Sequence, residues 1–134
     1  MLYVYVGLAG ALGALVRYEI GVGIHNFYGG SFPFPTLAVN LIGSFLLGWL
    51  THFLFRTERF SPTVVTALGT GFIGSFTTFS TFSVETIVMI ETGNLMGALF
   101  YVTLSIFLGL FSSWMGYKLG NRRFRRFTSR EGES

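Results

Sequence analysis

A glycine-dotted, hydroxyl-rich segment interrupts a long apolar stretch of this sequence. Residues 69–83 read Gly-Thr-Gly-Phe-Ile-Gly-Ser-Phe-Thr-Thr-Phe-Ser-Thr-Phe-Ser, inside an apolar segment that runs from Thr63 to Ile90. Glycine loosens a helix, and irregular main chain at membrane depth is tolerated only where it packs against protein or lines a wet cavity. Broken helices of this kind bind ions in transport proteins. The segment therefore predicts an ion-handling site.

Aromatic and hydroxyl side chains share this segment. Phe76, Phe79 and Phe82 follow one another at intervals of three, with threonine and serine between them. A phenyl ring has a positive edge, so ring edges that face a pore attract a small anion while hydroxyls replace part of its water. The chain contains 16 phenylalanines, and we interpret most of them as packing residues. The alternation with hydroxyls favours an anion pathway here.

Polar residues also lie on two other apolar segments. Asn40 and Ser44 are one helical turn apart, and an amide at this depth either serves a pore or joins helices through hydrogen bonds. Tyr101, Ser105 and Ser112 fall within a sector of about 40° on a helix. Serine also bonds its own helix carbonyls, so this polar stripe alone does not establish a site.

Few charged residues lie within the apolar segments, where they are costly and indicate function. Arg17 and Glu19 occur in the first segment and Glu85 near the end of the third. Arg17 either reaches toward the membrane interface or lies at a pore entrance. His25 and His52 lack nearby carboxylates or cysteines, so we interpret both as loop or interface residues rather than metal ligands.

The elements that must position these residues are four membrane-spanning helices. The chain has 134 residues, of which 51% are hydrophobic and 11% charged, so a membrane protein is expected. About 20 apolar residues span a bilayer. We predict an all-α fold with a broken third helix, in one domain over residues 1–134. The predicted spans are 2–24, 36–55, 63–90 and 95–119.

Turn signals and small residues refine these spans. Ser61 and Pro62 predict a helix cap and a first helical position. Glycines recur at close spacing, among them Gly43 with Gly48 in the second span and Gly116 with Gly120 around the fourth, and in lipid such residues let helices approach closely. The connection over 91–94 is very short, so the third and fourth spans should be antiparallel neighbours.

Basic residues gather on one side of the predicted topology. Every lysine and arginine except Arg17 lies at Arg56, Arg59 or from Lys118 onward. The positive-inside rule favours cytoplasmic termini. We interpret the basic tail, 120–134, as a surface for anionic lipid headgroups rather than for nucleic acid. The sequence contains no phosphate-binding loop, HExxH or nucleophile-elbow motif, so nothing indicates an enzyme.

Taken with Asn40 and Arg17-Tyr18, the run over 69–83 resembles that of the Fluc-type (CrcB) fluoride channels, and the likeness covers all four spans. The resemblance implies passive fluoride export through two pores in an antiparallel dimer, with a structural sodium ion at its centre. It also implies a multi-pass protein of a bacterial or archaeal cell membrane. The partner subunit would be a second copy in dual topology or, alternatively, a paralogue.

The resemblance also implies residue roles. Phe79 and Phe82 correspond to the aromatic pair of the pores, and the backbone carbonyls of Gly74 and Thr77 to the sodium ligands. Glu85 resembles an acidic residue near the pore mouth. Gly109 departs from the pattern because it lies where another serine of the polar track is expected. The other pore or fluoride-binding positions are Asn40, Ser80, Thr81, Ser83, Tyr101, Ser105 and Arg17.

Two other function classes compete with a fluoride channel. A small four-helix proton-coupled exporter of drugs or cations has a similar length, but it needs a membrane carboxylate, for which Glu19 is the candidate. A membrane scaffold without transport activity would not need a hydroxyl-rich broken helix. The neutral donors of this sequence suit passive conduction better than proton coupling.

Overall fold

The protein is described by a computed structural model that covers the backbone of residues 1–57 and 60–131 and the side chains of residues 1–54 and 60–122. All described elements are helical. The basic tail and the connection at Arg56 and Arg59 therefore lie largely outside the described side chains. In chain order the elements are α1 (Leu2–Tyr28), α2 (Phe34–Thr57), α3 (Pro62–Thr66), η1 (Ala67–Ile73), α4 (Gly74–Phe76), α5 (Phe79–Glu91) and α6 (Leu95–Glu131).

The four predicted spans are confirmed, with later ends for the first and fourth helices. Segments Leu2–Tyr28, Phe34–Leu54, Pro62–Glu91 and Leu95–Arg122 are long and apolar enough to cross a membrane. Helix α1 continues past the predicted end because its stop is Gly29, which adopts the left-handed conformation with φ 56° and bonds the His25 carbonyl. Helix α6 runs into the basic tail because no proline or glycine interrupts the chain between Gly120 and Glu131.

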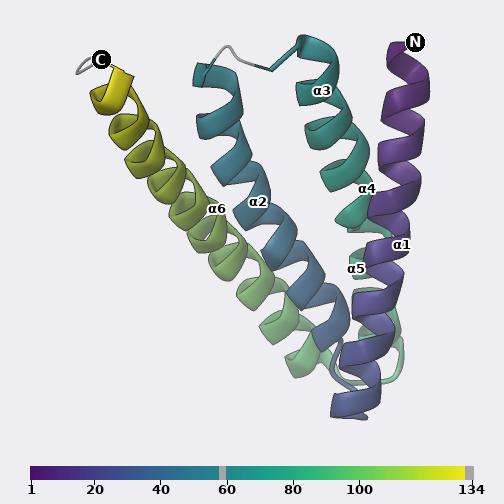
Figure 1. Ribbon diagram of the computed structural model, residues 1–134. Coiled ribbons are helices and arrows are strands. Elements are labelled where there is room, and N and C mark those ends of the chain that lie inside the picture. Colours follow the sequence, from purple (N-terminus) through teal and green to yellow (C-terminus); the bar gives the residue numbers. More distant parts are fainter. Residues whose placement is uncertain (58–59, 132–134) are drawn as a thin grey trace.

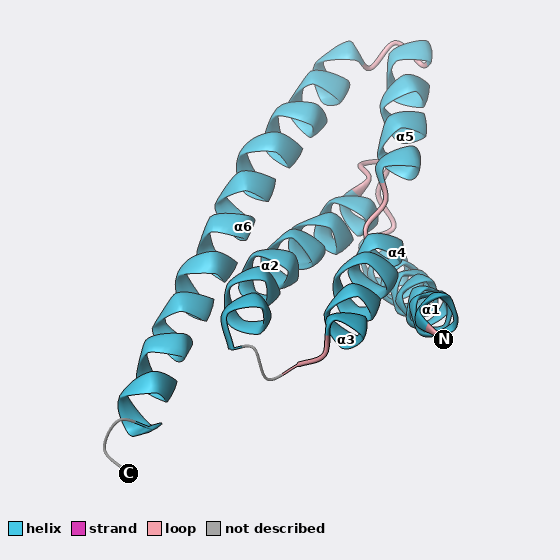
Figure 2. Cartoon of the chain, turned by 90° about the horizontal axis from the view of Figure 1, so that it is seen from above, coloured by secondary structure: helices cyan, strands magenta, loops and turns pink. Residues whose placement is uncertain are grey.

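Helix α2 lies between two groups of helices. Figure 1 shows α6 on one side of α2, and α1 with the helices of the third span on the other side. The view from above in Figure 2 shows the same order. The N-terminus, the start of α3 and the end of α6 lie at one end of the molecule, as an even number of spans requires.

Helices α2 and α6 pack through their main chains. A Cβ atom at Gly48 would overlap the Ser113 carbonyl oxygen, and one at Gly116 would overlap that of Phe45. The Ser112 hydroxyl donates to the Leu41 carbonyl oxygen at 3.0 Å. We call this contact the α2–α6 seam. The prediction that these glycines serve close helix packing is confirmed at the seam.

His52 lies on α2 at the seam, two residues before the end of the second span, so the loop alternative is wrong. Its side chain is 6% exposed, and its Nε2 lies 3.1 Å from Asn121 Oδ1. The Tyr117 ring packs edge-on against the imidazole. The extension of α6 beyond the predicted end adds Asn121 to the contacts of this histidine. His25 lies on α1 and is exposed.

The third span is broken, as predicted, and packs closely on α1. Ser61 caps α3 by accepting the Val64 amide hydrogen at 3.4 Å. The chain then widens into the π-helix η1 and ends its first half with α4. A Cβ atom at Gly13 on α1 would overlap the Phe72 carbonyl oxygen, and one at Gly71 would lie 2.7 Å from the Val6 carbonyl oxygen. This contact holds α1 against η1.

Candidate functional site

The helix break consists of two extended threonines. Thr77 has φ −78° and ψ 158°, and Thr78 has φ −145° and ψ 120°. The Thr78 hydroxyl caps α5, because its oxygen accepts the Thr81 amide hydrogen at 3.2 Å. The same hydroxyl donates to Thr81 Oγ1 at 2.9 Å and lies 3.3 Å from Ser80 Oγ. A hydroxyl-rich segment thus satisfies its own main chain at the start of α5.

Asn40 binds the break from α2. Its Nδ2 donates to the Thr78 carbonyl oxygen at 2.9 Å, and its Oδ1 accepts the Thr78 amide hydrogen at 2.8 Å. One side-chain amide therefore satisfies both main-chain polar groups of Thr78. The second hydrogen of the Asn40 Nδ2 is not used by these two bonds.

These bonds change the hydrogen-bond ladder of the third span. In an unbroken α-helix the Thr78 amide hydrogen would reach the Gly74 carbonyl, and the Thr81 amide hydrogen would reach the Thr77 carbonyl. Both hydrogens instead bond side-chain oxygens, those of Asn40 and Thr78. The carbonyl oxygens of Gly74 and Thr77 are thereby released from their helical partners.

A groove of about 420 Å³ lies beside the break, and we call it the phenylalanine groove. The Phe79 and Phe82 rings line it with centroids 5.9 Å apart, and Phe79 is 80% exposed. Ser105 Oγ is buried and has no hydrogen-bond partner among the described residues. The other residues that line the groove include Asn40, Ser44, Gly74, Thr77 and Thr78.

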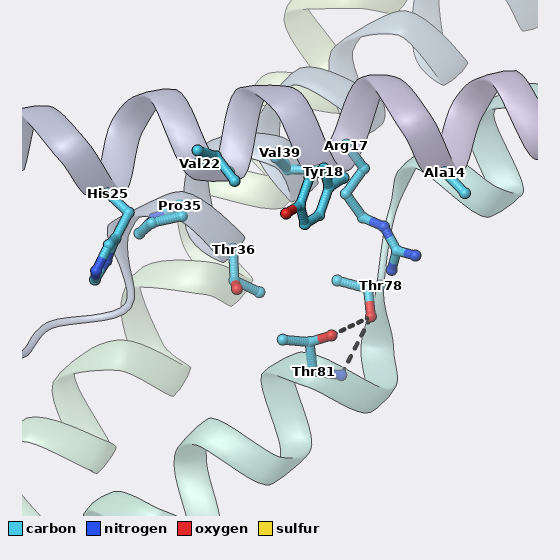
Figure 3. Close-up of a pocket in the computed structure, with 11 residues that line it drawn as sticks. Ala14, Arg17, Tyr18, Val22, His25, Pro35, Thr36, Val39, Thr78 and Thr81 are labelled. Carbon is cyan, nitrogen blue, oxygen red and sulfur yellow. Dashed lines mark hydrogen bonds between the residues drawn. The ribbon is translucent and has the colours of Figure 1, made fainter.

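A second groove, of about 520 Å³, lies on the other side of the break between α1 and the start of α2. We call it the arginine groove. Figure 3 shows Arg17 extending from α1 toward Thr78, which is bonded to Thr81. No carboxylate is among the described residues that line this groove, so Arg17 makes it electropositive. Because Thr78 lines both grooves, the break is the partition between them.

Glu85 on α5 connects its own helix to α2 and α6. Its Oε1 accepts the Thr36 hydroxyl hydrogen at 2.7 Å, and its Oε2 accepts the Tyr101 hydroxyl hydrogen at 2.8 Å. Tyr101 is fully buried, and its ring centroid lies 5.1 Å from that of Phe82. Both carboxylate oxygens of Glu85 are therefore hydrogen-bonded next to the aromatic pair.

The structure brings together most of the residues that the sequence singled out, but not all. Tyr101 bonds Glu85, Ser105 lines the phenylalanine groove and Ser112 bonds α2, so the three residues of the polar stripe of α6 lie in three different surroundings. Ser83 donates to the Phe79 carbonyl of its own helix at 2.9 Å. The phenylalanine groove collects Asn40, Gly74, Thr77, Phe79, Phe82 and Ser105, whereas the arginine groove collects Arg17 and Thr81.

Sequence reasoning missed two polar residues at this site. Thr78 holds the break, and the available signal was a hydroxyl residue directly before a helical run, which is a cap pattern. Thr36 binds Glu85 across 49 positions of sequence, and no local pattern indicates such a contact.

Comparisons with known proteins identify relatives of this chain. A family model described as CrcB-like protein, Camphor Resistance (CrcB), matches residues 4–117. The chain is 50% identical to "Fluoride-specific ion channel FluC 1" of Bacillus cereus over 121 residues, which cover 90% of this chain and 88% of that relative. It is 44% identical to "Fluoride-specific ion channel FluC 2" of Listeria innocua over 126 residues, which cover 94% and 95%.

Proposed function

This chain belongs to the CrcB-like protein family, and on that premise we propose that it is a fluoride channel that exports fluoride passively across a cell membrane and excludes chloride. Its four spans make it a multi-pass membrane protein. The observation that carries the proposal is the phenylalanine groove, where aromatic rings and neutral hydrogen-bond donors line one path beside a broken helix.

Fluoride is small and strongly hydrated, so a pathway must replace its water with donors at close range. Three kinds of group offer this along the phenylalanine groove. Asn40 retains one amide hydrogen, Ser105 has a buried hydroxyl, and the rings of Phe79 and Phe82 present positive edges. Arg17 raises the local anion concentration in the arginine groove, on the other side of the break.

A structural sodium ion fits the released carbonyls. Carbonyl oxygens are hard ligands that suit such an ion at a helix break. The Gly74 and Thr77 oxygens have lost the amide hydrogens that would pair with them in a helix, because those hydrogens bond Asn40 and Thr78. Sodium would supply fixed positive charge there. Two carbonyls from each of two subunits would complete the site if a twofold axis passes through it.

An antiparallel dimer is the proposed assembly, with two fluoride pathways. Phe79 is 80% exposed in a single chain, although it lies beside a helix break that must be shielded from lipid. A partner subunit that covers Phe79 and Gly74 would enclose the pathway. We favour two copies of this chain in dual topology over pairing with a paralogue.

Labelling of a single introduced cysteine tests dual topology, because the chain contains no other cysteine. Ser134, which lies outside the described residues, is the position for Ser134→Cys. In intact cells, dual topology predicts that a membrane-impermeant thiol reagent labels about half of the copies. Complete protection would indicate one orientation and therefore a partner of another sequence.

The alternative function, a proton-coupled exporter, needs a carboxylate in the transport path. Glu19 is exposed on α1 and does not line either groove among the described residues. Glu85 lies nearer, but both of its oxygens accept hydrogen bonds. These positions favour the channel.

Efflux from liposomes that contain only the purified protein tests the proposed function. Fluoride-selective and chloride-selective electrodes would follow both anions from vesicles of the same batch. A fluoride channel predicts rapid release of fluoride and chloride release at the rate of protein-free vesicles. Equal release of both anions, or of neither, would contradict the proposal.

A further inference from the structure

The third span is broken although no proline lies in it beyond its first turn. Pro62 is the last proline of the chain, so the covalent structure does not prevent the helix from continuing through Thr77 and Thr78. What competes with the helix is a set of side-chain bonds to the main chain. The competitor that comes from outside the third span is Asn40, on α2.

We propose that Asn40 is a positioning residue for the sodium site: its amide holds the Thr78 main chain away from Gly74 and so keeps the Gly74 carbonyl available to the cation, while the Thr78 hydroxyl does the same for the Thr77 carbonyl. This inference rests on the sodium site of the proposed function. It assigns Asn40 a task separate from contact with fluoride.

The two bonds of Asn40 act on the two main-chain polar groups of Thr78, its amide and its carbonyl. By accepting the Thr78 amide hydrogen at 2.8 Å, Oδ1 takes the donor that would otherwise close on the Gly74 carbonyl. By donating to the Thr78 carbonyl at 2.9 Å, Nδ2 fixes the residue in its extended conformation. Without the amide, the Thr78 N–H would be left unsatisfied, and its nearest helical acceptor is Gly74.

Thr78 completes the same arrangement from within the third span. Its hydroxyl oxygen accepts the Thr81 amide hydrogen and so releases the Thr77 carbonyl. The two released carbonyls therefore depend on two different side chains, that of Asn40 on α2 and that of Thr78 in the break itself. This gives the inference two independent variants for testing.

The test is a sodium titration of thermal stability on the purified protein, with N-methyl-D-glucamine as the replacement cation at constant ionic strength. Asn40→Leu removes both bonds while keeping an apolar side chain of similar size. We define the sodium midpoint as the sodium concentration that gives half of the parent's total rise in melting temperature over the titrated range. Loss of two hydrogen bonds predicts that this midpoint rises about tenfold. Ser112→Ala is the matched control, since it removes one interhelical bond to a carbonyl at the seam. Its sodium midpoint should equal that of the parent.

A second substitution separates the sodium role from the anion role. Asn40→Asp keeps an acceptor for the Thr78 amide hydrogen but places a negative charge in the pathway. Its sodium midpoint should stay within about threefold of the parent's, because the bond that keeps the Thr78 amide hydrogen away from the Gly74 carbonyl survives. Its fluoride efflux should fall. Asn40→Leu should lose both properties.

If Asn40→Leu does not fold, the sodium titration is carried out on Thr78→Val and Thr78→Ser instead. Serine keeps the capping hydroxyl and should titrate like the parent, whereas valine should raise the sodium midpoint. Parent-like midpoints in Asn40→Leu, or in Thr78→Val when that pair is used, would overturn the inference. A parent whose stability ignores sodium would overturn it too. Absence of fluoride efflux would refute only the channel, since the titration needs no transport.

Discussion

The α2–α6 seam and the break of the third span contain similar residues, but the seam is a closed helix contact and the break exposes main-chain groups. Each has a polar side chain that bonds a main-chain carbonyl of another span, Ser112 to Leu41 at the seam and Asn40 to Thr78 at the break. Ser112 adds a bond to a residue inside the continuous helix α2. Asn40 also accepts an amide hydrogen, so it replaces part of the helix ladder. The seam therefore stays closed, and the break exposes main-chain oxygens.

Glycine shows the same contrast. Gly48 and Gly116 at the seam are buried against the main chain of the neighbouring helix. Gly74 at the break is exposed, and the nearest atom to a Cβ there would be the Gly69 carbonyl oxygen at 3.9 Å. Small residues in lipid thus provide either close packing or room beside a site, depending on whether the hydrogen-bond ladder is complete.

The largest expected effect concerns the seam. Gly116→Val places a side chain against the Phe45 carbonyl and should destabilise the protein by about 3 kcal/mol or prevent its purification, as overpacking does. Thermal melting in detergent measures this. Gly109→Ala, on the same helix with open space around its Cβ position, is the control and should melt within a few degrees of the parent. Equal melting of the two variants would show that the seam is not tightly packed.

The next effect concerns the break. Phe79→Ile and Phe82→Ile remove the ring edges of the phenylalanine groove, and each should slow fluoride efflux about tenfold or more. The measurement is fluoride efflux from liposomes with matched amounts of protein. Phe107→Ile, at a ring on α6 that is 69% exposed, is the control and should conduct like the parent. Parental efflux in both Phe79→Ile and Phe82→Ile would indicate that the two rings serve packing and not conduction.

A paired serine test compares the two regions directly. Ser105→Ala removes the buried hydroxyl that has no partner among the described residues, so efflux should fall severalfold, about the effect of one hydrogen bond. Ser112→Ala removes the seam bond, so it should lower stability by about 1 kcal/mol and leave efflux unchanged. Efflux and melting temperature on the same preparations give both readings. Reduced efflux in Ser112→Ala with parental efflux in Ser105→Ala would indicate that the pathway lies at the seam.

The smallest effect is expected at Thr77. Thr77→Ser retains the main-chain carbonyl and a hydroxyl that can donate to the Ile73 carbonyl, as threonine does at 3.0 Å. Its melting temperature in sodium should therefore differ from that of the parent by less than the change for Gly74→Val, which adds a branched side chain next to the break. A larger loss for Thr77→Ser would indicate that the hydroxyl, and not the carbonyl, binds the cation.

The sequence predicted what depends on local composition. Apolar length gave four spans, and the glycines and hydroxyls of 69–83 gave the broken third helix. The grouping of Asn40 with Phe79 and Phe82 came from a family resemblance, and the three residues do line one groove. These features follow from patterns within a single segment or motif.

Contacts between distant segments were not predictable in the same way. Thr36 bonds Glu85 on another helix, and His52 is buried because α6 extends past it to Asn121. Neither contact has a periodic signal in the sequence. The sequence leaves the role of Asn40 open between a pore residue and an amide that joins helices. Only the geometry reveals that Asn40 replaces main-chain hydrogen bonds at Thr78.

The central claim is that this protein conducts fluoride passively through neutral groups at the break. The most direct measurement is fluoride efflux from potassium-loaded liposomes at equal pH on both sides, with and without the potassium ionophore valinomycin. Because a channel moves net charge, efflux should begin only when valinomycin lets potassium leave as well. Efflux that needs a proton gradient, or that proceeds fully without the ionophore, would contradict passive fluoride conduction and favour a coupled transporter.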